Sequence, residues 1–68
     1  MEIQQIKYFI NVARYKSFTQ AAAKLFVTQP MLTRVIKQLE AELGVKLIER
    51  TSKYFRLTDA GELFYQKA

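Results

Sequence analysis

The sequence of 68 residues contains no cysteine and no histidine. It therefore cannot form a disulfide, supply a thiolate nucleophile or build a Cys/His zinc site. It also has no Gly-rich phosphate loop and no evident pairing of its 6 carboxylates, which are usual signs of an enzyme active site. These absences argue against an enzyme, and we expect no metal and no cofactor. The lack of cysteine also fits a cytoplasmic location.

Long hydrophobic runs are absent as well. Lys7, Asn11 and Arg14 interrupt every apolar stretch near the N-terminus, so no signal-peptide core is present. No run elsewhere approaches the ~20 residues of a membrane-spanning helix. Glycine and proline are scarce, with 2 and 1 residues, whereas 50% of the residues are hydrophobic. This composition argues against disorder and predicts one small domain, stabilised by helix packing or by a partner subunit.

Positive charge is what the sequence has in excess. It contains 11 Lys and Arg residues against 6 Asp and Glu residues, which gives a net charge of +5. A basic balance in a small domain favours polyanionic partners, either nucleic acid or an anionic membrane surface. Because many soluble domains are basic, the choice of partner depends on where the cations lie along the chain.

The stretch from Thr28 to Gly44 predicts a helix with defined ends. Thr28 suits the N-cap, Pro30 suits the first turn, and Gly44 suits the left-handed position that ends many helices. The apolar residues between these ends follow the spacing of one helical stripe and are Leu32, Val35, Ile36, Leu39 and Leu43.

The opposite face of this helix is polar and basic. At about 100° per residue, it gathers Gln29, Pro30, Thr33, Arg34 and Lys37. No carboxylate lies among them, since Glu40 and Glu42 come only near the C-terminal end and are expected to face away from any phosphate. Taken alone, this pattern is best interpreted as an ordinary solvated face. The flanking elements decide between that interpretation and a binding surface.

Two shorter helices are predicted before this stretch. The first spans Met1–Tyr15 and is expected to bury a stripe of Ile3, Ile6, Phe9, Ile10 and Ala13. A basic membrane anchor is the weaker interpretation, because its polar face would need more cations. The second helix begins at Ser17, which forms a capping box with Gln20, and ends at Leu25. Residues 26–28 then form a connection of helix-turn-helix length, in which Phe26 and Val27 are expected to pack against the core.

After Gly44 the apolar period changes from 3.6 to 2, which predicts a hairpin of two short strands. The strands lie on either side of a polar tip at Ser52 and Lys53, and they are expected to lean on the helices through Leu47, Ile48 and Leu57. The predicted hairpin carries three cations, Arg50, Lys53 and Arg56, and only one acid, Glu49. The alternative interpretation is a structural hairpin whose lysine guards the sheet edge against further pairing.

A last helix is predicted from Thr58, with Thr58 as its N-cap and Asp59 complementing the helix dipole. Gly61 in its first turn costs ~1 kcal/mol relative to alanine, which indicates a close approach of another backbone or of a phosphate. No stop signal appears before Ala68, so we expect the natural chain to continue.

The order of these elements predicts a mostly α winged helix-turn-helix, with a three-helix core, a two-stranded β wing and the start of a linker helix. Residues 1–58 would form the DNA-binding domain, and residues 59–68 would begin a truncated linker or dimerisation helix. In this arrangement the third helix enters the major groove of duplex DNA, and the wing lies on the backbone beside it.

Four stretches of the sequence also carry a family resemblance. They are S-F-T-Q-A-A-A-K-L (17–25), V-T-Q-P-M-L-T-R (27–34), L-E-A-E-L-G-V-K-L-I-E-R-T (39–51) and R-L-T-D-A-G (56–61). Together they resemble the DNA-binding domain of LysR-type transcriptional regulators. The resemblance implies sequence-specific binding of double-stranded DNA by a bacterial regulator. It also implies a homodimeric or larger parent protein, whose further domain would sense a small-molecule effector.

Individual residues acquire expected roles from the pattern and from this resemblance. The expected DNA contacts are Thr28, Gln29, Pro30, Met31, Thr33, Arg34, Lys37, Arg50 and Lys53. By resemblance, the helix after Thr58 begins a dimerisation helix, and its apolar residues Leu63 and Phe64 are the expected contacts. Met31 and Thr33 depart from the residues most common in the family, so base preference is expected to differ there.

Two other functions fit the sequence less well than DNA binding. A winged helix that binds protein would need an apolar patch on the third helix, where the sequence offers only Met31. RNA binding fits the charge, but the narrow major groove of A-form RNA does not admit a reading helix.

Overall fold

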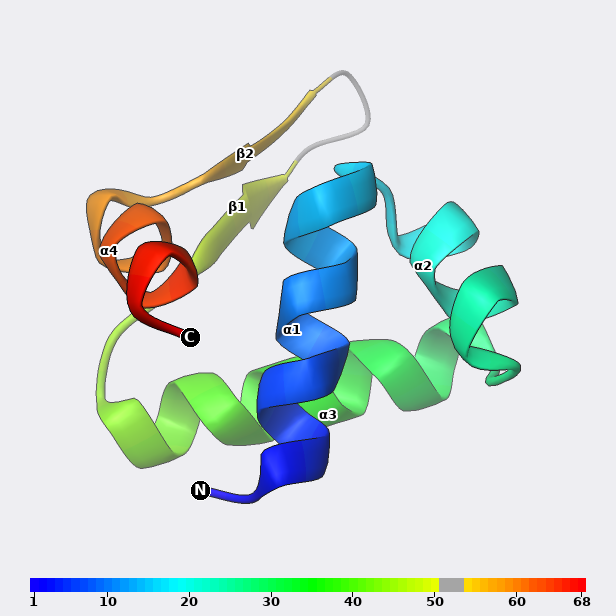
Figure 1. Ribbon diagram of the computed structural model, residues 1–68, viewed down its shortest axis with the longest axis horizontal. Coiled ribbons are helices and arrows are strands. Elements are labelled where there is room, and N and C mark those ends of the chain that lie inside the picture. Colours follow the sequence, from blue (N-terminus) through cyan, green and yellow to red (C-terminus); the bar gives the residue numbers. More distant parts are fainter. Residues whose placement is uncertain (51–53) are drawn as a thin grey trace.

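A computed structural model describes residues 1–50 and 54–68 of the chain. The described residues form four helices and one antiparallel pair of strands, in the predicted order (Figure 1). The elements are α1 (Ile3–Tyr15), α2 (Phe18–Leu25), α3 (Gln29–Leu43), β1 (Ile48–Arg50), β2 (Phe55–Leu57) and α4 (Asp59–Lys67). This arrangement confirms the prediction of a mostly α winged helix-turn-helix. Within the described part of the chain, no helix is long and apolar enough to cross a membrane.

The helices begin and end where their capping residues predict. The hydroxyls of Ser17, Thr28 and Thr58 each accept a hydrogen bond from the backbone N–H three residues further on, at donor–acceptor distances of 3.1, 3.2 and 3.0 Å. Gly44 ends α3 with a φ of +74°. Such caps satisfy backbone groups that have no partner inside the helix. The chain therefore turns at points that short-range chemistry determines.

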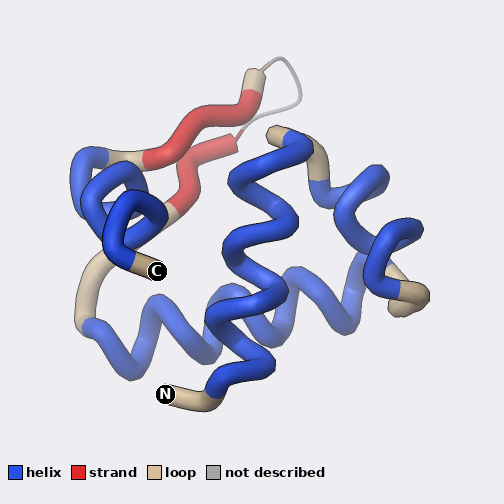
Figure 2. Tube along the Cα trace, in the orientation of Figure 1, coloured by secondary structure: helices blue, strands red, loops and turns tan. Residues whose placement is uncertain are grey.

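The core lies where α1 crosses α3, with α2 on one side and the hairpin and α4 on the other (Figures 1 and 2). Its largest fully buried side chains are Phe9, Val12, Leu32, Leu39 and Leu47. Phe64 of α4 and the half-buried residues of the hairpin pack against this cluster. All three N-terminal helices and the hairpin thus share one core, which holds α3 against the domain by its apolar stripe.

The predicted inner face of α1 was correct for Phe9 and Ala13, wrong for Ile3, and only half-buried at Ile6 and Ile10. The buried residues are Gln5, Tyr8, Phe9, Val12 and Ala13. Ile3, the first residue of α1, is 85% exposed, whereas Gln5 in the same turn is buried. Tyr8 buries a larger apolar surface than an isoleucine, and its hydroxyl still accepts a hydrogen bond from the Gln4 side chain at 3.3 Å.

The turn between α2 and α3 also differs from expectation. Val27 packs partly against the core, as predicted, but Phe26 is 93% exposed. Phe26 adopts a left-handed φ of +59°, and the N–H groups of Phe26 and Val27 donate to carbonyls of Ala23 and Ala22 at 3.3 and 3.0 Å. This Schellman arrangement satisfies the end of α2 and turns the Phe26 side chain away from the core.

The hairpin leans on the helices through the predicted residues. Ile48 pairs with Leu57, while Leu47 and Ile48 are only 1% and 6% exposed. The close approach predicted at Gly61 is that of another backbone, since a Cβ added there would overlap the carbonyl oxygen of Leu47. The same carbonyl accepts a hydrogen bond from the Thr58 N–H at 3.0 Å. The start of α4 is therefore pressed against the backbone of Leu47, the residue before β1.

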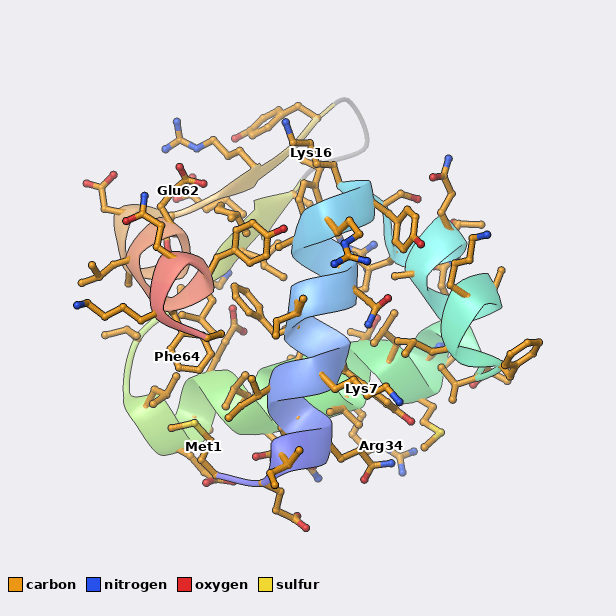
Figure 3. All side chains as sticks on the ribbon, viewed as in Figure 1. Met1, Lys7, Lys16, Arg34, Glu62 and Phe64 are labelled. Atoms are coloured by element: carbon orange, nitrogen blue, oxygen red, sulfur yellow. The ribbon has the colours of Figure 1, made fainter. Side chains whose placement is uncertain are left out.

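A polar network joins the N-terminus of the chain to the C-terminal turn of α3. The Met1 ammonium lies 2.6 Å from a carboxylate oxygen of Glu42, and the Gln5 amide donates to the other oxygen at 3.2 Å (Figure 3). Hydrogen bonding to the Met1 ammonium, supported by Gln5, lowers the pKa of Glu42, and the same contact raises the pKa of the Met1 amino group.

These shifts predict a pH-dependent contribution to stability. The pair stabilises the fold between the two ordinary pKa values. Its contribution is lost as the pH falls through the lowered pKa of Glu42, or rises through the raised pKa of Met1. We expect Glu42→Gln to flatten the dependence of Tm on pH, measured by thermal unfolding from about pH 3 to about pH 10. The exposed Glu62→Gln is the matched control, and superimposable slopes for both variants would contradict the assignment.

Candidate nucleic-acid interface

The polar residues predicted to share one face of α3 do so. Gln29, Pro30, Thr33, Arg34 and Lys37 line a shallow depression along the outer side of the helix. All of them are exposed except Thr33, which is half-buried. The apolar stripe on the other side of α3 is held in the core by Leu32, Ile36 and Leu39, so the polar face cannot rotate inward. The structure therefore presents a row of amide, hydroxyl and cationic groups to solvent.

A second depression lies between α3 and β1 and extends this surface towards the wing. It has a volume of about 190 Å³ and is lined by three cations, Lys37, Lys46 and Arg50. Thr33 lines both depressions, so the two are continuous. Lys46 was missed by sequence reasoning. The sequence feature that could have identified it is its position directly before Leu47. Because Leu47 is buried and neighbouring side chains of an extended chain point to opposite sides, Lys46 faces outward at the junction with α3.

Arg50 is anchored by an aromatic cluster. Its guanidinium carbon lies 3.9 Å from the ring centroid of Phe18, the first residue of α2, which is the distance of a cation–π contact. The Phe18 ring packs edge-on against Phe55 of β2, with centroids 6.2 Å apart. This contact joins both strands to α2 and sets the position of Arg50 beside α3.

The other hairpin cations have different surroundings. Arg56 donates to the carboxylate of Glu49 on the paired strand at 2.9 Å, and this hydrogen bond raises the pKa of Arg56. The positive charge that Arg56 was expected to add to the hairpin is therefore neutralised by Glu49. Lys53 and the polar tip lie outside the described residues.

The start of α3 is tied to the start of α2. The Gln29 side-chain amide donates to the hydroxyl of Thr19 at 2.6 Å. The hydroxyl of Thr28 accepts the capping hydrogen bond, while Met31 is 41% exposed beside the polar face. Thr19 was not predicted as a site residue, because its contact joins residues ten positions apart and no local pattern marks it. This hydrogen bond positions the Gln29 side chain, and the amide oxygen of Gln29 accepts no hydrogen bond from α2 or α3.

Met31 is the most exposed large hydrophobic residue of α3, a helix that is described in full. The structure thus offers no apolar patch on α3 of the kind that a protein-binding winged helix would need. The alternative of a protein-binding function for this helix gains no support.

Glu40 has a structural role at the edge of the surface. Its carboxylate accepts hydrogen bonds from the backbone N–H groups of Leu47 and Ile48, at 2.8 and 3.2 Å. It was expected to face away from phosphate, yet it lines the second depression together with Lys37. Both backbone donors hold the carboxylate at the base of the hairpin, which fastens the wing to α3.

Removing this carboxylate is expected to loosen the wing. Glu40→Ala leaves two part-buried N–H groups without their acceptor, which costs about 1–3 kcal/mol of unfolding free energy. Glu40→Gln retains an acceptor oxygen and should lose less. Urea denaturation measures both, and an Ala variant as stable as the Gln variant would show that the carboxylate does not hold the hairpin.

The two residues predicted for dimerisation lie away from the polar face of α3. Leu63 is 56% exposed and lines an apolar depression with Leu43, Val45 and Ala60. Phe64, labelled in Figure 3, lines the same depression and also contacts the core, with its ring centroid 5.4 Å from that of Phe9. Leu63 and Phe64 therefore border one apolar depression, with Leu63 exposed and Phe64 partly buried against the core.

Comparison with protein families places this geometry in a known group. Residues 3–62 match the family model described as bacterial regulatory helix-turn-helix protein, lysR family. The chain belongs to this family. It is 48% identical over 68 residues to the probable cat1 operon transcriptional activator of Acinetobacter lwoffii and 47% identical to the regulator BenM of Acinetobacter baylyi. Each comparison covers 100% of this chain but only 22% of the relative, so this LysR-family chain spans about a fifth of their length.

Solved structures of LysR-family proteins have the same fold. The DNA-binding domain of BenM in complex with catB site 1 DNA matches with a TM-score of 0.94 and 46% identity, covering 98% of this chain and 75% of that one. The complex of the CbnR DNA-binding domain with DNA matches with a TM-score of 0.93 and 46% identity, covering 98% and 77%. Both relatives are described as bound to DNA, and the curated relatives are named as transcriptional regulators.

Proposed function

We propose that this chain is the DNA-binding domain of a bacterial LysR-type transcriptional regulator and binds double-stranded DNA sequence-specifically. In this proposal α3 enters the major groove and the wing lies on the backbone beside it. The supporting observation is the continuous surface from Gln29 to Arg50, which presents cations and hydrogen-bonding groups along α3 and the hairpin. Membership in the LysR family and the DNA complexes of BenM and CbnR support the same function.

Three side chains of α3 are proposed to read base edges. Arg34 suits a bidentate contact with guanine, Thr33 suits the methyl group of thymine, and Gln29 suits adenine. Thr19 takes one N–H of Gln29, which leaves its amide oxygen to accept from a base amino group. Met31 lies beside them and would contact the groove through apolar surface.

The remaining site residues are proposed to hold the phosphate backbone. Lys37, Lys46 and Arg50 surround the second depression, and Lys53 is proposed to act with them from the wing tip. Thr28 and Pro30 place the N-terminal end of α3, with its positive dipole, towards a phosphate. Neutralising phosphates in this way releases counterions, so binding should weaken steeply with salt.

The whole regulator is proposed to act as a homodimer or larger assembly in the cytoplasm, without enzymatic activity. Residues 1–58 would bind DNA, and residues 59–68 would begin the linker helix, with Leu63 and Phe64 on its dimerisation side. Two copies would occupy half-sites separated by multiples of ~34 Å. A further domain of the parent protein would sense a small-molecule effector.

Selection of duplexes from a random pool, followed by binding titrations, tests this function. We expect an enriched sequence in which single base-pair changes cost about 1–3 kcal/mol of binding free energy. Log K should fall linearly with log salt, with a slope of about −0.9 for each phosphate neutralised. Equal affinities for enriched and scrambled duplexes at every salt concentration would contradict sequence-specific binding.

A further inference from the structure

A separate groove lies between α1 and α2, away from the proposed DNA surface. It has a volume of about 570 Å³, and none of its lining residues belongs to α3 or to the hairpin. The two most exposed large apolar side chains of the described residues, Phe26 at 93% and Ile3 at 85%, both line it. The groove shares no lining residue with either depression of the proposed DNA surface.

The conformation of Phe26 is unfavourable for the isolated fold. Its φ of +59° lies in the left-handed region, where glycine is the usual residue at a helix end. Its ring gains almost no burial in return, because 93% of the residue is exposed. The left-handed backbone closes α2, but the exposed ring contributes nothing to the core, which points to a role for the ring outside the fold.

The charges around the groove indicate which partner would fit. Lys7 of α1, labelled in Figure 3, and Lys24 of α2 line it, and no carboxylate is among its lining residues. Two cations beside two apolar anchors are too few for a phosphate backbone or for an anionic membrane, both of which need a dense basic face. A second copy of the chain would bring the same lysines and a net charge of +5 to the interface, where like charges repel.

We propose that this groove binds an acidic segment of another protein, with apolar anchors that contact Phe26 and Ile3. Carboxylates of the segment would pair with Lys7 and Lys24, which gives the surface its electrostatic selectivity. Aromatic anchors of this kind contribute most of the binding energy at protein interfaces. The surface would let the domain hold a protein partner while α3 remains on DNA.

Two substitutions separate this role from folding. Phe26→Asn removes the ring while keeping a residue that tolerates the left-handed region. Lys16→Asn is the matched control, because Lys16 also has a positive φ, of 52°, but lies at the other end of α2. Both variants should fold and should bind the enriched duplex as the unchanged chain does.

The probe is a synthetic amphipathic helical peptide with Leu and Phe on one face and Glu on the other, and its control carries Lys in place of Glu. In ¹H–¹⁵N NMR titrations of the chain, we expect the acidic peptide to shift the amides of Ile3, Lys7 and Lys24 saturably, with or without duplex DNA. Phe26→Asn should weaken this binding at least about tenfold, and Lys16→Asn should not. A double variant with Lys7→Glu and Lys24→Glu should bind the Lys-containing peptide in place of the acidic peptide.

The opposite results would overturn the proposal. They are the absence of saturable shifts at about 1 mM acidic peptide, equal binding of both peptides, and unchanged binding by Phe26→Asn. Shifts of the groove amides caused by duplex DNA alone would assign the groove to DNA. Shifts that depend on the concentration of the chain alone would assign it to self-association.

Discussion

Replacing Gly61 by alanine is expected to destabilise the fold by about 3 kcal/mol, the upper end of what overpacking usually costs. At an open helical position the same change stabilises by ~1 kcal/mol. Here the added methyl group would overlap the backbone carbonyl of Leu47, which cannot rotate away as a flexible side chain would. The start of α4 would have to move away from Leu47, which also strains the hydrogen bond from Thr58 to the same carbonyl. For a domain of 68 residues this loss is a large part of the total stability.

Gly44 provides the matched control for this experiment. It has a φ of +74°, but a Cβ there would meet nothing within 4 Å. Gly44→Ala should therefore cost only the left-handed conformation, about 1–2 kcal/mol, and Gly44→Asn less. Urea denaturation of these three variants distinguishes the two causes. A Gly61→Ala variant that is as stable as the unchanged chain would contradict the close contact between α4 and the backbone of Leu47.

Replacing Arg34 by alanine is expected to weaken binding of the enriched duplex by about 1–3 kcal/mol, or about 5- to 150-fold in Kd. Neither ion pair among the described residues involves Arg34, so its guanidinium is available to a ligand. It projects from the polar face of α3 (Figure 3). If it reads a guanine, the variant should also lose discrimination at one base pair while its affinity for scrambled duplexes changes less.

Arg14→Ala is the matched control, since Arg14 is an exposed cation on α1 that does not line either depression of the proposed DNA surface. It should leave sequence discrimination intact. Lys46→Ala should weaken all duplexes to a similar extent and reduce the salt slope by about one. Competition titrations against every single base-pair variant of the enriched site measure these effects. Unchanged affinities for enriched and scrambled duplexes in Arg34→Ala would remove Arg34 from the interface.

Local chemistry explains which parts of the fold were predictable. The hydroxyl caps at Ser17, Thr28 and Thr58 act over three residues, so they can be recognised in the sequence. The apolar stripe of α3 follows one period for four turns and was correct. In α1 the predicted and the observed inner faces share Phe9 and Ala13, and packing against the other elements buries Tyr8 and Val12 beside them. Tertiary contacts of this kind are not visible in local periodicity.

The residues of the site likewise fall into those that local sequence predicts and those that tertiary contacts place. The polar row along α3 was predictable because one helical period determines it. The position of Arg50 depends on Phe18, and that of Gln29 depends on Thr19, through contacts between separate elements. Lys46 joins the surface only because Glu40 fastens the hairpin beside α3. The outward turn of Phe26 arises from a left-handed residue that its identity did not suggest, since glycine or asparagine is usual there.

The most direct test of the account is an NMR titration of the chain with the duplex enriched from a random pool. We predict that the shifted signals map to the polar face of α3 and to the second depression, including Thr33, Arg34, Lys46 and Arg50. The groove between α1 and α2 should remain unshifted. Shifts confined to that groove, or the same weak shifts with a scrambled duplex, would contradict the proposal that α3 reads DNA.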